Sequence, residues 1–293
     1  MTLPPSDTPK DLQADLDRAA QYLAQADGLL IAAGAGMGVD SGLPDFRGTE
    51  GFWQAYPALA TAGLDFAEIA TTRTFENDPA LAWGFYGHRL QLYRDTVPHA
   101  GFDLLQLLAA RIPHGAFVFT SNVDGQFQTA GFAADRIVEC HGSLHHLQCT
   151  KPCSPDLWEA KDLRPVVNDE TCQWGTALPR CANCGRVARP NILMFGDANW
   201  VSDRTELQEG RMRRWLYACK RPVVLELGAG AHLPSVRNKG QSVAGHPAGR
   251  LIRINPREFE VIRTEDVGLR MGALAGLQAL ASRLPSRVPS RLP

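Results

Sequence analysis

Short apolar runs separated by longer amphipathic or polar segments set the pattern of this chain. Five runs predict buried strands, at residues 28–33, 116–120, 136–139, 222–227 and 250–254. The first, GLLIAA at 28–33, is wholly apolar, as is typical of a parallel strand covered on both faces. Apolar residues at helical spacing predict helices at 11–25, 101–110 and 205–218. The alternation predicts an α/β fold with a Rossmann-like, doubly wound parallel sheet.

Two regions break the alternation. Residues 49–94 are rich in aromatic side chains and predict a helical module, whereas residues 147–189 are rich in Cys, Pro and polar residues and show little periodicity. The second region predicts a small insert that something other than a hydrophobic core holds together. We therefore expect the following parts: an N-terminal segment and helix at 1–27, a main domain from 28–48, 95–146 and 190–281, inserted modules at 49–94 and 147–189, and a disordered tail at 282–293.

The composition of the chain limits the classes of molecule that it is expected to bind. Thirty basic and thirty-one acidic residues leave a net charge of -1, so neither nucleic acid nor a membrane surface is indicated. The N-terminus shows no secretory pattern, and no apolar run is long enough to span a bilayer. Four of the seven cysteines cluster in the middle of the chain, which favours metal ligation in a reducing compartment over disulfides. We therefore expect a cytoplasmic protein.

A glycine-rich turn follows the first strand, where residues 31–48 read IAAGAGMGVDSGLPDFRG. Gly34, Ala35 and Gly36 would let the backbone approach a phosphate closely, although the same glycines fit a turn without a ligand equally well. The third glycine of the dinucleotide fingerprint is missing, which disfavours an ordinary dehydrogenase. Three further side chains that suit binding of an amide, a ring and a phosphate come next: Asp45, Phe46 and Arg47.

With these residues the sequence resembles the sirtuin (Sir2-like) family, bacterial type, whose cofactor loop reads GAG-x-S-x-x-SG-[IL]-PDFR. Gly38 stands where the family usually has Ser. The resemblance runs from about residue 28 to about residue 254, in the family's order, and implies that NAD is bound as a co-substrate. It also implies that Gly228 and Asn255 contact NAD, although residues 228–231 read GAGA where the family has G-T-S or G-S-S.

Two strand-end motifs carry the implied chemistry. Residues 120–124, TSNVD, resemble the family's T-Q-N-[IV]-D, with Ser121 in place of Gln. The resemblance implies that Asn122 holds the nicotinamide ribose and a water molecule, and that Asp124 lies in the nicotinamide region. His141, before a glycine, resembles the family's H-G and is implied as the catalytic base, a role that suits a neutral imidazole. The other histidines singled out are expected to be surface or hydrogen-bonded core groups: His88, His99, His114 and His246.

The implied reaction begins when the acyl-lysine carbonyl oxygen attacks C1′ of the nicotinamide ribose and expels nicotinamide. His141 then takes a proton from a ribose hydroxyl, which attacks the imidate carbon. Water completes the reaction and yields free lysine and O-acyl-ADP-ribose.

Two cysteine pairs, Cys149 with Cys153 and Cys181 with Cys184, have spacings that can close a tetrahedral zinc site. Cys172 lies between the pairs and could replace one ligand. Sirtuins carry a four-cysteine module at this point in the chain, which implies a structural Zn²⁺ with no open coordination position.

The segment 189–197, RPNILMFGD, resembles the family's R-P-x-[IV]-[VL]-x-F-G-E, which implies that Leu193, Phe195 and Gly196 line the acyl-lysine tunnel and the peptide site. Tyr86 and Arg89 share a helical face and resemble the Y-x-x-R of members that accept succinyl, malonyl or glutaryl lysine. The alternative is that Tyr86 packs in the core and Arg89 lies on the surface.

The sequence thus favours an NAD-dependent protein-lysine deacylase that acts on acylated protein lysines. A mono-ADP-ribosyltransferase on the same fold is one alternative, and His141 together with Asn122 argues against it. A non-catalytic NAD-binding sensor is the other, and the departures at Gly38, Ser121 and residues 228–231 leave it open.

Overall fold

The structure, a computed structural model, describes residues 9–45 and 48–284. Phe46, Arg47 and most of the expected disordered tail, residues 285–293, lie outside the described residues. The chain divides into two compact units, which are treated separately below. The first contains Met1–Asp40, His99–Val118 and Arg214–Pro293, and the second contains Ser41–Pro98 and Phe119–Arg213.

Six strands form one sheet in the order β11-β10-β9-β1-β2-β3. The strands are β1 (Gly28–Ala33), β2 (Ala116–Thr120), β3 (Ile137–Glu139), β9 (Pro222–Leu227), β10 (Arg250–Ile254) and β11 (Val267–Leu269). The pairings β1–β9, β9–β10 and β10–β11 are parallel. The strand order reverses between β1 and β9, as in a doubly wound sheet, and the predicted fold class is confirmed. Strand β11 was not predicted.

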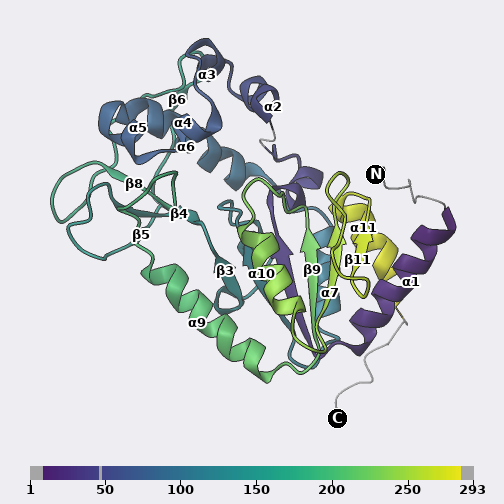
Figure 1. Cartoon of the computed structure of the whole chain (residues 1–293). Coiled ribbons are helices and arrows are strands. Elements are labelled where there is room, and N and C mark those ends of the chain that lie inside the picture. Colours follow the sequence, from purple (N-terminus) through teal and green to yellow (C-terminus); the bar gives the residue numbers. More distant parts are fainter. Residues whose placement is uncertain (1–8, 46–47, 285–293) are drawn as a thin grey trace. The chain divides into compact units, whose positions relative to one another are not determined.

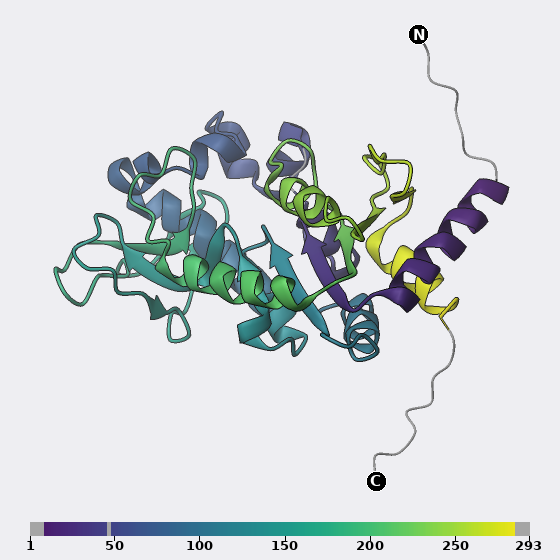
Figure 2. The ribbon, with the colours of Figure 1, turned by 60° about the horizontal axis from the view of Figure 1, so that its bottom comes forward.

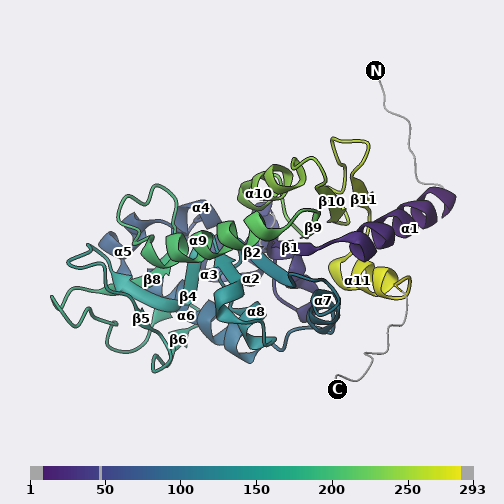
Figure 3. The ribbon, with the colours of Figure 1, turned by 90° about the horizontal axis from the view of Figure 1, so that it is seen from below.

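In the first unit, helices cover both faces of the strands. Helix α10 (Ser235–Ala244) lies on one face, and α7 (Gly101–Ala109) and α11 (Ala273–Ala281) lie on the other (Figures 2 and 3). Helix α1 (Pro9–Gln25) packs beside α11 and β11 (Figure 1). Every residue of β1 and β9 is buried, including Glu226, whose carboxylate pairs with Arg253 of β10. The helices predicted at 11–25 and 101–110 are present, with ends shifted by one or two residues.

The second unit begins with a run of helices, as predicted for residues 49–94. They are α2 (Gly48–Ala55), α3 (Pro57–Thr61), α4 (Phe66–Ile69), α5 (Thr72–Asn77) and α6 (Pro79–Asp95). Short polar residues cap three of them: Asp65 forms a capping box with Glu68, Thr71 caps α5, and Asp78 caps α6 before Pro79. Their aromatic side chains form one buried cluster around α6.

The Cys-rich region forms small antiparallel sheets. Strands β5 (Trp158–Glu159), β4 (Gly142–Cys149) and β8 (Ala188–Ile192) pair in that order, and β6 (Val167–Asn168) and β7 (Gln173–Trp174) form a hairpin. Cys149 and Ala188 are register partners. The hairpin packs on α6 at Gly84, where a Cβ atom would lie 1.9 Å from the Cys172 carbonyl oxygen.

The remaining elements connect these parts. They are α8 (Gln126–Thr129), α9 (Asp203–Ala218) and the short 3-10 turns Ala35–Met37, Val39–Ser41 and Ala134–Arg136. The predicted helix at 205–218 is therefore present and begins two residues earlier. None of the helices in the described part of the chain has the length and apolar character needed to cross a membrane.

Candidate active site

In the first unit, the turns after β1 and β9 lie against each other at the point where the strand order reverses. The Gly34 amide donates to the Leu227 carbonyl, and the Gly36 amide donates to the Gly228 carbonyl, both at 3.0 Å. A Cβ atom on Gly36 would lie 2.7 Å from Gly228 Cα. Gly228 itself has φ +58°, a conformation that favours glycine. These glycines therefore allow the two backbones to touch.

Side chains hold the turn at 228–231, although it lacks the family's hydroxyl groups. Asn255 Nδ2 donates to the Ala229 carbonyl at 3.0 Å, and the Arg237 guanidinium donates to the same carbonyl at 3.0 and 3.2 Å. The Glu258 carboxylate accepts from the Ala231 amide at 3.0 Å. The structure thus brings predicted residues Gly34, Ala35, Gly36, Gly228 and Asn255 to one end of the sheet. Sequence reasoning missed Arg237.

In the second unit, the segments after β2 and β3 run together. The Cys140 amide donates to the Thr120 carbonyl at 2.9 Å, and His145 Nε2 donates to the Asp124 carbonyl at 2.8 Å. The Asn122 amide donates to Thr120 Oγ1 at 3.0 Å, which bends the chain directly after the strand. Asn122 and Ser121 are half-buried, so both side chains keep access to solvent.

Asp124 is buried, and burial raises the pKa of its carboxyl to about 6. The Gln126 amide donates to this carboxyl at 2.9 Å and favours its charged form. Gln126 Nε2 also donates to the Tyr93 and Thr96 carbonyls at 3.3 and 3.2 Å, which anchors the loop. At Gly125, φ is +73° and a Cβ atom would lie 2.7 Å from the His145 ring.

His141 is half-buried just after β3, and burial lowers the pKa of its imidazole. The ring is therefore neutral at pH 7, as a general base requires. Gly142 follows with φ +78°, and a Cβ atom there would lie 2.0 Å from the Asn191 carbonyl oxygen. The Leu193 amide donates to the His141 carbonyl at 3.0 Å. These contacts join the histidine to the segment predicted to bind the acyl-lysine peptide.

A buried ion pair supports that segment. Arg189 Nη2 lies 2.7 Å from one carboxylate oxygen of Asp197 and 2.9 Å from the other, and neither side chain is exposed. The Phe195 amide donates to the Ala70 carbonyl at 3.0 Å. Leu193 and Phe195 nevertheless remain 40% and 37% exposed, and Gly196 has φ +66°. The backbone is thus held firmly while two apolar side chains stay accessible.

Tyr86 and Arg89 both lie on α6 and are both buried, but they contact different side chains. Tyr86 stacks on Phe75 with ring centroids 5.7 Å apart and is fully buried. Arg89 is also buried, so the alternative, with Tyr86 in the core and Arg89 on the surface, is right for Tyr86 and wrong for Arg89. Its Nε and Nη2 donate to Tyr93 Oη at 2.8 and 2.5 Å. The Phe66 ring lies 5.8 Å from the Arg89 guanidinium and 6.1 Å from the Phe195 ring.

The four predicted zinc ligands form a cluster. The Sγ atoms of Cys149, Cys153, Cys181 and Cys184 all lie within 4.8 Å of one another. Two pairs, Cys149–Cys184 and Cys153–Cys181, are separated by 3.6 Å. Tetrahedral Zn–S bonds of ~2.3 Å require sulfurs about 3.8 Å apart, so the donor set and its spacing fit a closed structural zinc site.

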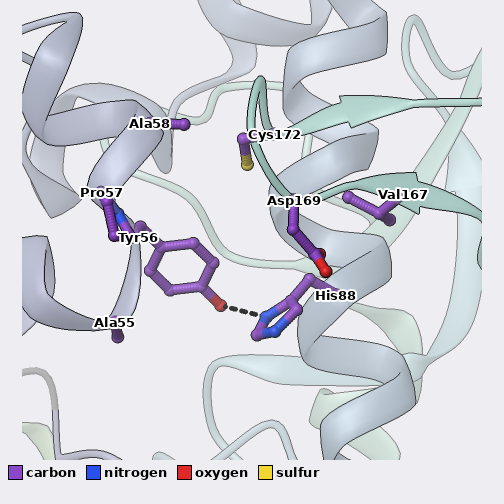
Figure 4. A pocket seen from close by; sticks show the side chains of 8 residues that line it. All are labelled: Ala55, Tyr56, Pro57, Ala58, His88, Val167, Asp169 and Cys172. Atoms are coloured by element: carbon purple, nitrogen blue, oxygen red, sulfur yellow. Dashed lines mark hydrogen bonds between the residues drawn. The ribbon is translucent and has the colours of Figure 1, made fainter.

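Cys172 is not part of this cluster, so it does not replace one of the four zinc ligands. It is buried with φ +52°, and it lines a cavity of about 160 Å³ where α3, α6 and the β6–β7 hairpin meet. Figure 4 shows Tyr56, His88 and Asp169 around the same cavity, with a 3.0 Å hydrogen bond between Tyr56 Oη and His88 Nδ1. His88 is thus a hydrogen-bonded, half-buried histidine, as predicted.

The Sir2 family model matches residues 34–211. The chain belongs to the Sir2 family. An "NAD-dependent protein deacylase" of Thermococcus kodakarensis is 30% identical over 264 residues, which cover 87% of this chain and 90% of the relative. Among solved structures, a Sir2 homolog–NAD complex is 24% identical with TM-score 0.69, covering 91% of this chain and 92% of that one. Sir2Tm bound to a propionylated peptide is 18% identical with TM-score 0.61, covering 91% and 97%. These structures share the Sir2 fold with this chain.

Proposed function

We propose that this Sir2 family chain is an NAD-dependent protein-lysine deacylase that produces free lysine, nicotinamide and O-acyl-ADP-ribose. The observation that carries the proposal is the junction of His141 with Leu193. A neutral imidazole and an exposed apolar segment are tied by one hydrogen bond of 3.0 Å. The deacylase names of the curated relatives and the propionylated peptide on Sir2Tm support the same activity.

In this reaction NAD supplies the ribose carbon that receives the acyl oxygen. His141 takes the proton of a ribose hydroxyl, and its lowered pKa keeps it unprotonated before that step. Asn122 orients the nicotinamide ribose, and residues Gly34–Gly36, Gly228 and Asn255 hold the dinucleotide. Leu193 and Phe195 cover the lysine stem, while the backbone beside them pairs with the substrate peptide. The partners are acylated lysines of other proteins, and the free cysteines support a reducing compartment, the cytoplasm.

Mass spectrometry with NAD and matched acetyl-lysine, succinyl-lysine and unmodified peptides tests the activity. Wild-type protein is expected to give acyl-dependent O-acyl-ADP-ribose, and His141→Ala is expected to abolish it. His246→Ala, at an exposed histidine of the first unit, is the matched control and should retain activity. A peptide that gains the mass of ADP-ribose would identify a transferase instead, and NAD binding without nicotinamide release would identify a sensor.

We propose in addition that Arg89 binds the terminal carboxylate of acidic acyl groups on the substrate lysine. It is a buried cation 5.8 Å from the Phe66 ring, and Phe66 in turn contacts the partly exposed Phe195. A guanidinium binds a terminal carboxylate through two parallel hydrogen bonds. Arg89→Met should reduce kcat/KM for succinyl-lysine at least tenfold more than for acetyl-lysine. Arg73→Met, at an exposed arginine on α5, should change neither. Equal losses on the two peptides would refute the assignment.

A further inference from the structure

His99 lies just before α7 and makes two hydrogen bonds that fix its protonation. Its Nδ1 accepts from the Gly101 amide at 3.0 Å, and its Nε2 lies 2.9 Å from the Met37 carbonyl oxygen. Because a carbonyl oxygen can only accept, Nε2 must carry the hydrogen and Nδ1 must be free of one. Both bonds therefore require the neutral Nε2–H tautomer.

The backbone around the ring is shaped to hold it. A Cβ atom on Gly101 would lie 2.4 Å from His99 Cε1 and 2.7 Å from Nδ1, so glycine at this position lets the ring lie against the start of α7. The Phe102 ring also packs against the imidazole, with ring centroids 5.1 Å apart. The imidazole is thus confined in position as well as in tautomer.

The acceptor, Met37, ends the 3-10 turn that follows β1. The Met37 amide donates to the Gly34 carbonyl at 3.0 Å, and the Gly38 amide donates to the Ala35 carbonyl at 3.1 Å. The Met37 carbonyl, two peptide groups further along, accepts from His99 instead. A side chain 62 residues away in sequence thereby sets the orientation of the last peptide group of the glycine-rich turn.

We propose that His99 is a positioning residue that holds the glycine-rich turn in the conformation that binds NAD. The proposal rests on the proposed function, because it assigns the turn to NAD. The Nε2–H bond fixes the direction of the Met37 carbonyl, and with it the end of the turn, before NAD binds. A single hydrogen bond of this kind is worth a change of about 3- to 10-fold in an equilibrium constant, which sets the expected effect on NAD affinity.

Three substitutions separate the two hydrogen bonds. His99→Gln places an amide N–H near the position of Nε2 and can still donate to Met37. His99→Asn places its carboxamide near Nδ1, so it can accept from Gly101 but does not reach Met37. His99→Leu makes neither bond and fills a similar volume. Thermal unfolding of each variant confirms that it is folded, and His246→Leu is the control at an exposed histidine of the same unit.

The readouts are the Kd of NAD by calorimetry and, without NAD, the hydrogen-exchange protection of the amides at 34–38. His99→Gln should stay within about 2-fold of wild type in Kd, whereas His99→Asn and His99→Leu should weaken NAD about 3- to 10-fold and lose protection in the turn. Wild-type affinity and protection in His99→Leu would overturn the proposal. So would wild-type behaviour of His99→Asn with loss in His99→Gln, since His99 would then only cap α7. If wild-type protein binds no NAD, the proposed function fails, and the exchange data still decide whether His99 holds the turn.

Discussion

Removal of the buried charge at position 197 is expected to destabilise the second unit strongly. The Asp197 carboxylate accepts from Arg189 at 2.7 and 2.9 Å, from the Asn199 amide at 3.0 Å and from the Met194 amide at 3.3 Å. Asp197→Asn keeps the shape but replaces one acceptor oxygen by an NH₂ group and leaves the Arg189 charge unpaired in a site without water contact. Breaking a buried ion pair from one side costs about 3–5 kcal/mol, and we expect a loss in this range.

The assay is urea unfolding followed by circular dichroism, combined with hydrogen exchange of residues 188–199. The exchange data are needed because two compact units can unfold in separate steps. Glu76→Gln, which breaks the exposed pair with Lys151, is the matched control and should cost less than about 1 kcal/mol.

A double variant, Arg189→Met with Asp197→Leu, should recover most of the loss, because apolar residues of similar volume often replace a buried ion pair without penalty. The reasoning is refuted if Asp197→Asn costs less than about 1 kcal/mol, or if the double variant is no more stable than the single one.

Three further predictions concern other parts of the chain. Cys184→Ser should reduce bound zinc to near zero in metal analysis, whereas Cys172→Ser should leave it at one ion per chain, since Cys172 lies outside the cluster. Gly228→Ala should cost at least about 2 kcal/mol in urea unfolding, because its φ is +58° and its Cβ would lie 2.4 Å from Gly36 Cα; Gly63→Ala, also at positive φ but in open space, should cost about 1 kcal/mol. Asp124 has a folded pKa of about 6 against an ordinary 3.8, so its contribution to stability falls as pH rises from about 4 to about 6. The difference in unfolding free energy between Asp124→Asn and wild type should therefore shift in favour of the variant over this interval, by on the order of 2 kcal/mol, and an unchanged difference would contradict the raised pKa.

The main sheet was predictable because most residues of its strands are apolar. The run at 28–33 is apolar from end to end, the runs at 116–120, 222–227 and 250–254 contain one or two polar residues each, and the structure has strands with the same bounds. The predicted strand at 136–139 begins one residue later, because Arg136 belongs to a 3-10 turn. Burial on both faces leaves little choice of register or conformation for such segments.

Strand β8 was not predictable in this way, because it reads Ala-Arg-Pro-Asn-Ile and its polar residues are buried. Their partners are distant in sequence or lie beyond the strand. Asn191 Nδ2 donates to Gln148 Oε1 at 2.9 Å, across 43 residues, and Arg189 pairs with Asp197 after the chain has turned. The residues next to a strand in the sequence do not indicate such pairs, because the partners lie elsewhere in the chain.

Some residues of the candidate site could be predicted from the sequence, and others could not. Motif residues such as His141 and the four cysteines could be found because their chemistry is tied to short spacings. Arg237 and His99 each donate to one carbonyl group of a turn, Arg237 to Ala229, eight residues away, and His99 to Met37, 62 residues away. Nothing in the sequence around either residue signals that contact, and His99 was expected to be an ordinary hydrogen-bonded histidine.

The pairing of Cys149 with Ala188 has a consequence for how this family member can vary. The zinc-binding region leaves the fold at one rung of the β4–β8 ladder and returns at the same rung, so its two ends are neighbours about 5 Å apart. A segment with adjacent ends can be lengthened, shortened or exchanged at little conformational cost to the strands that carry it. Loops of this region can therefore change in length within the limits set by the β6–β7 hairpin, which packs on α6 at Gly84. Gly142 and Ile192, partners at the other end of the same ladder, keep their places beside His141 and Leu193.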